Sequence, residues 1–139
     1  MSLPLSVMIV EDEWDIAHLF SLCLEGFGFN TISFNEPFLA LDHFKQYPRK
    51  YCLALLDMYM NGLTGLELSM EIRKYSSQVK ILLITGYCKG DLPQSIDYKK
   101  AKISEVILKP VNFEKLGPRI LQLCSMESLG SSNSRFQQS

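Results

Sequence analysis

The sequence lacks several features, and each absence narrows what the protein is expected to be. No apolar run approaches the roughly 20 residues that a membrane-spanning helix needs. The first four residues, Met-Ser-Leu-Pro, form no basic, signal-like pattern, so we expect a cytoplasmic protein. The chain also lacks an excess of charge of either sign, because the net charge is −1 and the pI is near 6.1. This balance does not favour direct binding to nucleic acid or to an anionic membrane.

Cysteine is scarce as well, and its spacing argues against a thiol-based metal site. The four cysteines form no CxxC pair and no zinc-like spacing. Three of them fall in apolar segments, where a free thiol behaves as a small hydrophobic side chain. The fourth, Cys88, falls in a predicted loop, and loop exposure alone does not favour a redox role.

What the sequence does have is an alternation of strand-like and helix-like patterns that repeats five times. Its 139 residues, 47% of them hydrophobic, suit one domain with a sizeable core. Strands alternating with helices of this length indicate βαβ units and a parallel sheet. The strand over 30–34 is more polar than the others and is predicted at a sheet edge. The predicted strands are residues 5–10, 30–34, 52–57, 79–84 and 105–108.

The five predicted helices are marked by apolar residues at helical spacing and by residues that begin or end helices. The first helix ends near Gly26, and Pro37 opens the second. Asp91 is predicted to cap the fourth helix and Asn112 the fifth. From residue 126 onward the composition is rich in Ser, Gly and Gln, which predicts a flexible tail. The predicted organisation is one domain over 1–125 and a tail over 126–139.

Polar side chains follow four of the predicted strands at the point where each strand ends. Glu11 and Asp12 follow the first strand, and Asp57 ends the strand over 52–57. Thr85 and Lys109 follow the strands over 79–84 and 105–108. Because the carboxyl ends of parallel strands share one edge, where ligands bind, we expect these groups to converge there.

Convergence of three carboxylates predicts a hard divalent cation. Like charges that lie close together raise one another's pKa unless a cation offsets them. Mg²⁺ prefers oxygen ligands and commonly takes one or two carboxylates plus phosphate oxygens. The charges of three carboxylates, one magnesium ion and Lys109 then sum to zero. Such a pocket suits phosphoryl transfer, which depends mostly on positioning and charge neutralisation, and an aspartate is an established acceptor in that chemistry.

These motifs, in this order and at this spacing, resemble the receiver domain of two-component response regulators. The matching pieces cover about residues 5–124 and are Glu11-Asp12-Glu13, Leu55-Leu56-Asp57-Met58 with Met60 and Gly65, Thr85-Gly86, and Lys109-Pro110. The resemblance implies a chemotaxis-type, flavodoxin-like α/β fold. In that fold a doubly wound, five-stranded parallel sheet, (βα)5, has the strand order 2-1-3-4-5.

The resemblance also implies a role for each residue of the cluster. Asp57 is the implied phosphoacceptor, and Asp12 is an implied direct ligand of Mg²⁺. Glu11 is expected to bind the ion through water, while the backbone carbonyl of Tyr59 supplies a further ligand.

Two further residues are implied to contact the phosphoryl group. Thr85 is expected to donate a hydrogen bond to it and Lys109 to pair with it. The peptide bond between Lys109 and Pro110 is cis in the family.

The implied function is a signalling switch, and the chain is not expected to be an enzyme in the turnover sense. A sensor histidine kinase or a histidine phosphotransfer protein would phosphorylate it, whereas self-phosphorylation and self-dephosphorylation would be slow. A downstream protein partner or output domain would receive the signal. The family uses the surface of the fourth helix, fifth strand and fifth helix for homodimers or partners. Here the lysines of that surface favour an ordinary solvated face over a docking site.

The sequence departs from the family pattern in the acceptor loop, in the fifth strand and beside the acceptor. Asn61 stands where the family usually has proline, and Val106 stands where it usually has Tyr or Phe. Without that ring, output is expected to travel by backbone and loop shifts or to be muted. Tyr59 and Tyr87 occupy the positions that tune hydrolysis of the acyl phosphate in the family. Our hypothesis is that these two rings restrict the attacking water and lengthen the phosphorylated lifetime.

Three alternatives share parts of the pattern. A haloacid dehalogenase-type phosphatase needs a second aspartate where this chain has Tyr59, and it usually has a cap insertion. A flavin-binding carrier should have a Ser-, Thr- and Gly-rich phosphate loop where Glu11-Asp12-Glu13 stands. A phosphate-independent pseudo-receiver is favoured by Val106 but not by the complete set of acidic, Thr and Lys residues.

Overall fold

The computed structural model of the chain describes residues 5–86 and 95–125 and contains one five-stranded parallel sheet. The sheet has the order β2-β1-β3-β4-β5, so the predicted order 2-1-3-4-5 is confirmed. The more polar strand, β2, lies at an edge, as predicted. The strands are β1 (Ser6–Val10), β2 (Asn30–Phe34), β3 (Leu53–Asp57), β4 (Lys80–Thr85) and β5 (Glu105–Leu108).

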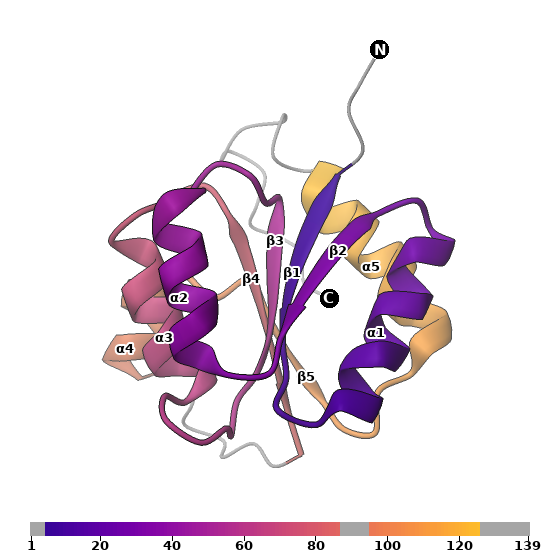
Figure 1. Cartoon of the computed structure of the whole chain (residues 1–139), viewed down its shortest axis with the longest axis horizontal. Helices are drawn as coiled ribbons and strands as arrows, with labels where there is room; N and C mark the ends of the chain where they lie inside the picture. Colours follow the sequence, from indigo (N-terminus) through magenta and orange to yellow (C-terminus); the bar gives the residue numbers. More distant parts are fainter. Residues whose placement is uncertain (1–4, 87–94, 126–139) are drawn as a thin grey trace.

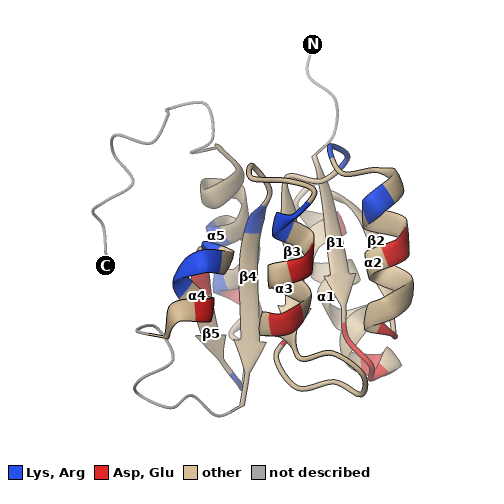
Figure 2. Ribbon diagram, turned by 90° about the vertical axis from the view of Figure 1, so that its left-hand side faces the viewer, with Lys and Arg blue, Asp and Glu red and all other residues tan. Residues whose placement is uncertain are grey.

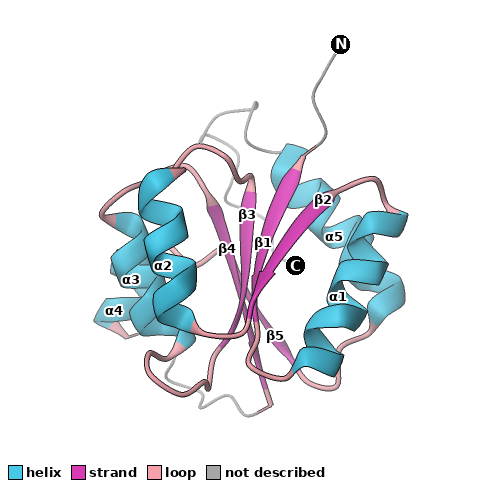
Figure 3. Cartoon of the chain, in the orientation of Figure 1, coloured by secondary structure: helices cyan, strands magenta, loops and turns pink. Residues whose placement is uncertain are grey.

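Helices cover both faces of the sheet. Two of them, α1 and α5, lie on one face, and the other three lie on the opposite face (Figure 1). Figure 2 shows the side that α2, α3 and α4 cover, and Figure 3 shows the loops that join helices to strands. None of the helices in residues 5–86 and 95–125 has both the length and the apolar character of a bilayer-spanning segment. The helices are α1 (Trp14–Gly26), α2 (Pro37–Gln46), α3 (Gly65–Arg73), α4 (Ile96–Ala101) and α5 (Phe113–Ser125).

Alternation along the strands divides the core between the two faces. In β1, Val7 and Ile9 pack with α1 and α5, while Met8 and Val10 pack with the opposite layer. All four are fully buried. A strand buried on both faces has no polar position to spare, which explains its continuous apolar sequence. Polar side chains are therefore expected at or just beyond the ends of such strands.

Strand register brings those first polar positions to one level. Val10 is paired with Leu56, so Glu11 lies level with Asp57. Asp57 is paired with Ile84, which precedes Thr85. Thr85 in turn is paired with Leu108, which precedes Lys109. The predicted convergence at the carboxyl edge therefore follows from the pairing of the strands.

Helix ends agree with the predictions in part. Pro37 is the first residue of α2, but the cap is Glu36, whose side chain accepts a hydrogen bond from the Leu39 N–H at 3.2 Å. Asn112 accepts from the Glu114 N–H at 3.0 Å, as a cap of α5 should. The predicted cap Asp91 lies outside the described residues, as does the predicted tail over 126–139. Within the described part of α4, Ser95 accepts from the Tyr98 N–H at 3.0 Å.

Helix α5 carries a notch that the sequence analysis did not predict. Gly117 lies under the ring of Phe27, the residue that ends α1, and an added Cβ would lie 2.2 Å from the ring. Pro118 follows inside the helix, where it has no N–H to donate. The contact ties the end of α1 to the first half of α5.

The short helix α4 depends on an arginine of the neighbouring helix. The guanidinium of Arg73 donates from Nε to the Ala101 carbonyl at 2.6 Å and from Nη2 to the Lys102 carbonyl at 3.1 Å. A third bond runs from Nη1 to the Ser76 carbonyl at 3.1 Å. Burial lowers the pKa of Arg73. A six-residue helix is too short to be stable alone, so this cation at its C-terminal end contributes much of its stability.

Replacing Arg73 by Gln is expected to loosen α4 selectively. The loss of hydrogen bonds from a charged, partly buried donor should lower the free energy of unfolding by about 2 kcal/mol. Hydrogen exchange read by mass spectrometry should become faster in Ile96–Ala101 and stay slow in β1 and β3. Lys74→Gln is the matched control, because its ammonium is exposed and, in the described part of the chain, pairs with Glu71 of α3 alone, at 3.1 Å. Equal effects of the two substitutions would contradict the assignment.

Candidate functional site

Three carboxylates lie together at the carboxyl edge of the sheet. One oxygen each from Glu11, Asp12 and Asp57 can be chosen so that all lie within 4.8 Å of one another. Glu11 is 1% exposed and Asp57 is 6% exposed. The structure therefore brings together the three acidic side chains that the sequence predicted as a cluster, and it removes two of them from water.

Glu11 has the most demanding environment of the three. Its Oε2 accepts a hydrogen bond from the Glu13 N–H at 3.0 Å, but its buried Oε1 has no hydrogen-bond partner within the described ranges. Burial raises the pKa of Glu11 to about 7, against the lowering effect of the Glu13 N–H, and Asp57 raises it further. A buried acceptor without a donor costs free energy, so this oxygen favours a cation.

Burial and a nearby cation have opposite effects on the pKa of Asp57. Burial raises the pKa of its carboxyl, whereas Lys109 and the Tyr59 N–H lower it. The Nζ of Lys109 lies 3.4 Å from Oδ1 of Asp57. The Lys109 N–H donates to the Thr85 carbonyl at 2.8 Å, which holds the backbone of Lys109 beside the end of β4. The peptide bond between Lys109 and Pro110 is cis, as the resemblance implied.

The donor set fits a hard divalent cation. It offers carboxylate oxygens only, one of them buried and without a partner among the described residues. Among the described residues, Lys109 supplies the ammonium beside these carboxylates, 3.4 Å from Asp57. Oxygen-only sets with excess negative charge suit Mg²⁺, Ca²⁺ or Mn²⁺ rather than a soft metal.

The other predicted residues lie around this cluster. Thr85, the last residue of β4, is buried and lies next to it in the register of the sheet. The side chain of Tyr59 is exposed, and Tyr87 lies outside the described residues. Val106 is partly buried and packs with the α2–α3–α4 layer, where Tyr98 also packs.

Gly65 has a positional role that sequence reasoning did not explain. An added Cβ would lie 2.6 Å from the Asp57 carbonyl oxygen and 3.0 Å from Cα of Met58. The Gly65 N–H donates to the Met58 carbonyl at 2.7 Å. The start of α3 can therefore approach the end of β3 closely, at Asp57 and Met58.

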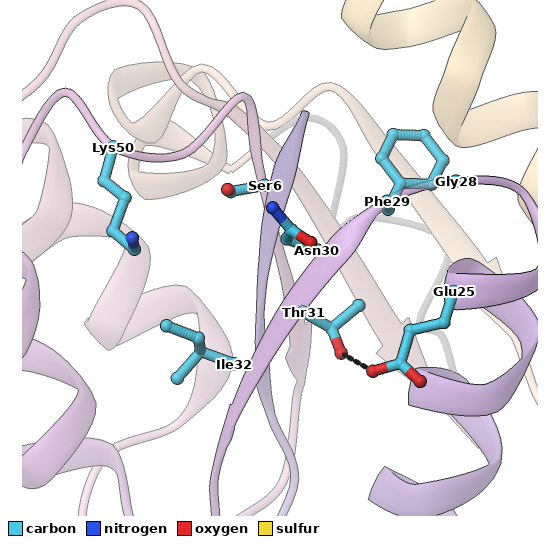
Figure 4. Close-up of a pocket in the computed structure, with 8 residues that line it drawn as sticks. All are labelled: Ser6, Glu25, Gly28, Phe29, Asn30, Thr31, Ile32 and Lys50. Atoms are coloured by element: carbon cyan, nitrogen blue, oxygen red, sulfur yellow. Dashed lines mark hydrogen bonds between the residues drawn. The ribbon is translucent and has the colours of Figure 1, made fainter. Parts of the chain in front are cut away.

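A pocket lies at the opposite edge of the sheet, away from this cluster. It measures about 590 Å³ and contains none of the predicted site residues. Figure 4 shows that it extends to both sides of β2, with Glu25 on one side and Lys50 on the other. Thr31 already donates to Glu25 at 3.0 Å.

Comparison with known proteins gives one consistent family. The sequence profile described as "Response regulator receiver domain" matches residues 7–121. The chain is 31% identical over 111 residues to the phosphoglycerate transport system transcriptional regulatory protein PgtA of Salmonella typhimurium, covering 80% of this chain and 26% of that protein. It is 32% identical to the uncharacterized transcriptional regulatory protein YkoG of Bacillus subtilis, covering 82% and 48%. The chain thus spans between a quarter and a half of the length of these relatives.

Solved structures show the same fold. A response regulator receiver domain protein from Clostridium thermocellum aligns with a TM-score of 0.80 at 24% identity, covering 90% of this chain and 98% of that one. The response regulator protein TrrA from Thermotoga maritima, in complex with Mg²⁺-BeF, aligns with a TM-score of 0.72 at 28% identity, covering 86% and 98%.

Replacing Glu11 by Gln is expected to stabilise the metal-free protein by up to about 3 kcal/mol near pH 8. Its pKa is raised from 4.5 to about 7 on folding, so the folded state favours the protonated form. The stability that this group contributes is fully present below pH 4.5 and is lost as the pH rises through 7. Gln imitates the protonated group, so its advantage should shrink as the pH falls.

Urea unfolding in EDTA across that pH range measures the effect. Glu13→Gln is the control, because that neighbouring side chain is exposed. A Glu11→Gln variant that is less stable than the wild type near pH 8, or whose advantage does not depend on pH, would contradict the assignment.

Proposed function

Because the chain belongs to the response regulator receiver domain family, we propose that Asp57 is the phosphoacceptor through which this receiver domain works in a two-component phosphorelay. Receiver domains serve signalling and are not enzymes in the turnover sense. The observation that supports the assignment best is the convergence of Glu11, Asp12 and Asp57 beside Lys109 at one sheet edge. A phosphate-independent module is not favoured, because this acid–lysine set is complete.

The phosphoryl transfer uses the ionised carboxylate of Asp57. One of its oxygens attacks phosphorus and the new O–P bond forms. The bond that breaks is the P–N bond of a phosphohistidine donor or, with acetyl phosphate, the P–O bond to the acetate group. Its electron pair leaves with the donor. Lys109, 3.4 Å from Oδ1, favours the ionised form of Asp57 and can pair with a phosphoryl oxygen. The hydroxyl of Thr85 can donate to another phosphoryl oxygen.

The metal in this proposal is Mg²⁺. Asp12, Asp57 and the backbone carbonyl of Tyr59 are its proposed direct ligands, and Glu11 holds it through water. When bound, the ion neutralises charge on the phosphoryl oxygens. The support from this chain is the oxygen-only donor set and the unpartnered Oε1 of Glu11 among the described residues.

The proposed phosphodonor is a sensor histidine kinase or a histidine phosphotransfer protein, in the cytoplasm. The proposed receiver of the signal is a protein partner or an output domain, without direct contact of this domain with nucleic acid or membrane. A homodimer through α4, β5 and α5 is the second arrangement that this surface allows. On this surface of the chain, Arg119 pairs with Glu105 at 2.6 Å, while Lys99 and Lys100 are exposed.

Incubation with Mg²⁺ and acetyl phosphate tests the assignment. The wild type should gain the mass of one phosphoryl group, and Asp57→Asn should gain none. EDTA should prevent the gain if the acidic cluster holds the metal. Intact-mass spectrometry reads the result, and equal modification of both proteins would exclude Asp57 as the acceptor.

The exposed ring of Tyr59 leads to a second prediction, about the lifetime of the phosphorylated state. If the rings at 59 and 87 restrict the attacking water, a Tyr59→Asn, Tyr87→Glu variant should lose its phosphoryl group several-fold faster than the wild type. Phosphate release after removal of the donor measures the rate. Tyr75→Ser, which changes an exposed ring at the end of α3, is the control. An unchanged rate in the double variant rules the hypothesis out.

A further inference from the structure

Cations without carboxylate partners gather at the edge opposite the acidic cluster. Lys45, in the last turn of α2, and Arg49 and Lys50, in the turn that follows, are exposed. None of the three forms an ion pair within residues 5–86 and 95–125. Figure 2 shows Lys and Arg at the upper ends of α2 and α3, where Lys74 also lies. The neutral balance of the whole chain therefore hides a local excess of positive charge.

Contacts place these cations and two exposed rings on one continuous surface. The Nζ of Lys45 lies 5.9 Å from the ring centroid of Tyr75, which joins the end of α2 to the end of α3. The Lys50 N–H donates to the Tyr47 carbonyl at 3.2 Å, closing the turn that presents Arg49. Tyr47 is 51% exposed and Tyr75 is 43% exposed. We call this surface the basic face: Lys45, Tyr47, Arg49, Lys50, Lys74 and Tyr75.

Helix ends explain only part of the basic face. Cations in the last turn of a helix interact favourably with its negative end, which accounts for Lys45 and, at the end of α3, Lys74. Arg49 and Lys50 lie beyond the last turn of α2 and stabilise no helix by this effect. Tyrosine and arginine, here Tyr47, Tyr75 and Arg49, are enriched at protein interfaces. The lysines beside them can contribute by electrostatic complementarity.

The nearest pocket does not neutralise this charge. Figure 4 shows Lys50 and Ile32 on one side of β2 and Glu25 on the other. The carboxylate of Glu25 accepts from Thr31, a residue of the strand that separates it from Lys50. Lys50 is therefore directed to the α2 side of the sheet, where the basic face lies.

We propose that the basic face binds an acidic segment of a protein partner. Three cations outside the ion pairs of the described residues, Lys45, Arg49 and Lys50, and two half-exposed rings fit carboxylates interspersed with an apolar side chain. A long polyanion or an anionic bilayer fits less well, because it interacts with the charge of the whole chain. That net charge is −1 and the pI is about 6.1, whereas domains that bind nucleic acid are usually strongly basic. A short acidic segment contacts the local surface alone.

The position of the basic face makes this binding compatible with phosphorylation. The face lies at the amino-terminal edge of the sheet, and Asp57 lies at the carboxyl edge (Figure 1). The two surfaces can be occupied at the same time, so the proposal does not depend on the phosphoacceptor role of Asp57.

The test uses a fluorescein-labelled peptide of alternating Glu and Asp with one central Phe, measured by anisotropy on the full chain. A Lys45→Gln, Arg49→Gln, Lys50→Gln variant should bind it at least about tenfold more weakly than the wild type. The matched control is Lys99→Gln, Lys100→Gln, Lys115→Gln, which removes the same charge from exposed positions elsewhere and should change affinity less than about twofold. Tyr47→Ser, Tyr75→Ser should weaken binding without changing its salt dependence.

Three outcomes would overturn the proposal: no binding by the wild type, equal losses in the two triple variants, or tighter binding of a thymidine oligonucleotide or of phosphatidylserine vesicles through the same residues. Amide chemical-shift changes on addition of the peptide should be confined to the basic face. This measurement uses the wild type alone, so it does not depend on whether a variant folds. Acetyl phosphate should modify the face variant as it does the wild type, so failure here and failure of the phosphoacceptor role are told apart.

Discussion

Repulsion among Glu11, Asp12 and Asp57 is the constraint on which the rest of the site depends. Like charges would separate in a flexible chain, but β1 and β3 are paired in register and buried on both faces, so their ends cannot move apart. The apolar core thus maintains an arrangement that is electrostatically unfavourable without a cation. Burial is the main cause of the raised pKa of Glu11, and the nearby charges of Asp57 and Asp12 raise it further. In the function proposed above, a bound cation offsets both effects.

Much of this arrangement could be predicted from the sequence, because both the fold and the site follow from where apolar runs end. Each buried strand is a continuous apolar segment, and the first polar residue after it belongs to the edge of a parallel sheet. Contacts in which a side chain binds backbone groups leave no such pattern in the sequence. The three acceptors of Arg73 are carbonyls, which every residue has, so no residue type marks them in the sequence. The basic face was also missed, because Lys74 and Tyr75 follow α3 and meet the segment from Lys45 to Lys50 only in the folded chain.

Helix direction gives the two edges of the molecule opposite character. In a parallel α/β sheet every helix begins at the carboxyl edge, so positive helix ends lie near the acidic cluster and negative ends near Lys45 and Lys74. The Glu13 N–H at the start of α1, which donates to Glu11, is a direct instance. The helix ends therefore favour carboxylates at the carboxyl edge and cations at the opposite edge of a chain that is almost neutral as a whole.

The notch at Gly117 has a consequence for how the sequence can change during evolution. The ring of Phe27 fills the space that a side chain at 117 would occupy. A gain of volume on α5 therefore has to be matched by a loss at the end of α1, and neither change is neutral alone. Positions 27 and 117 should vary as a pair among descendants of this chain, although they are separated by most of its length.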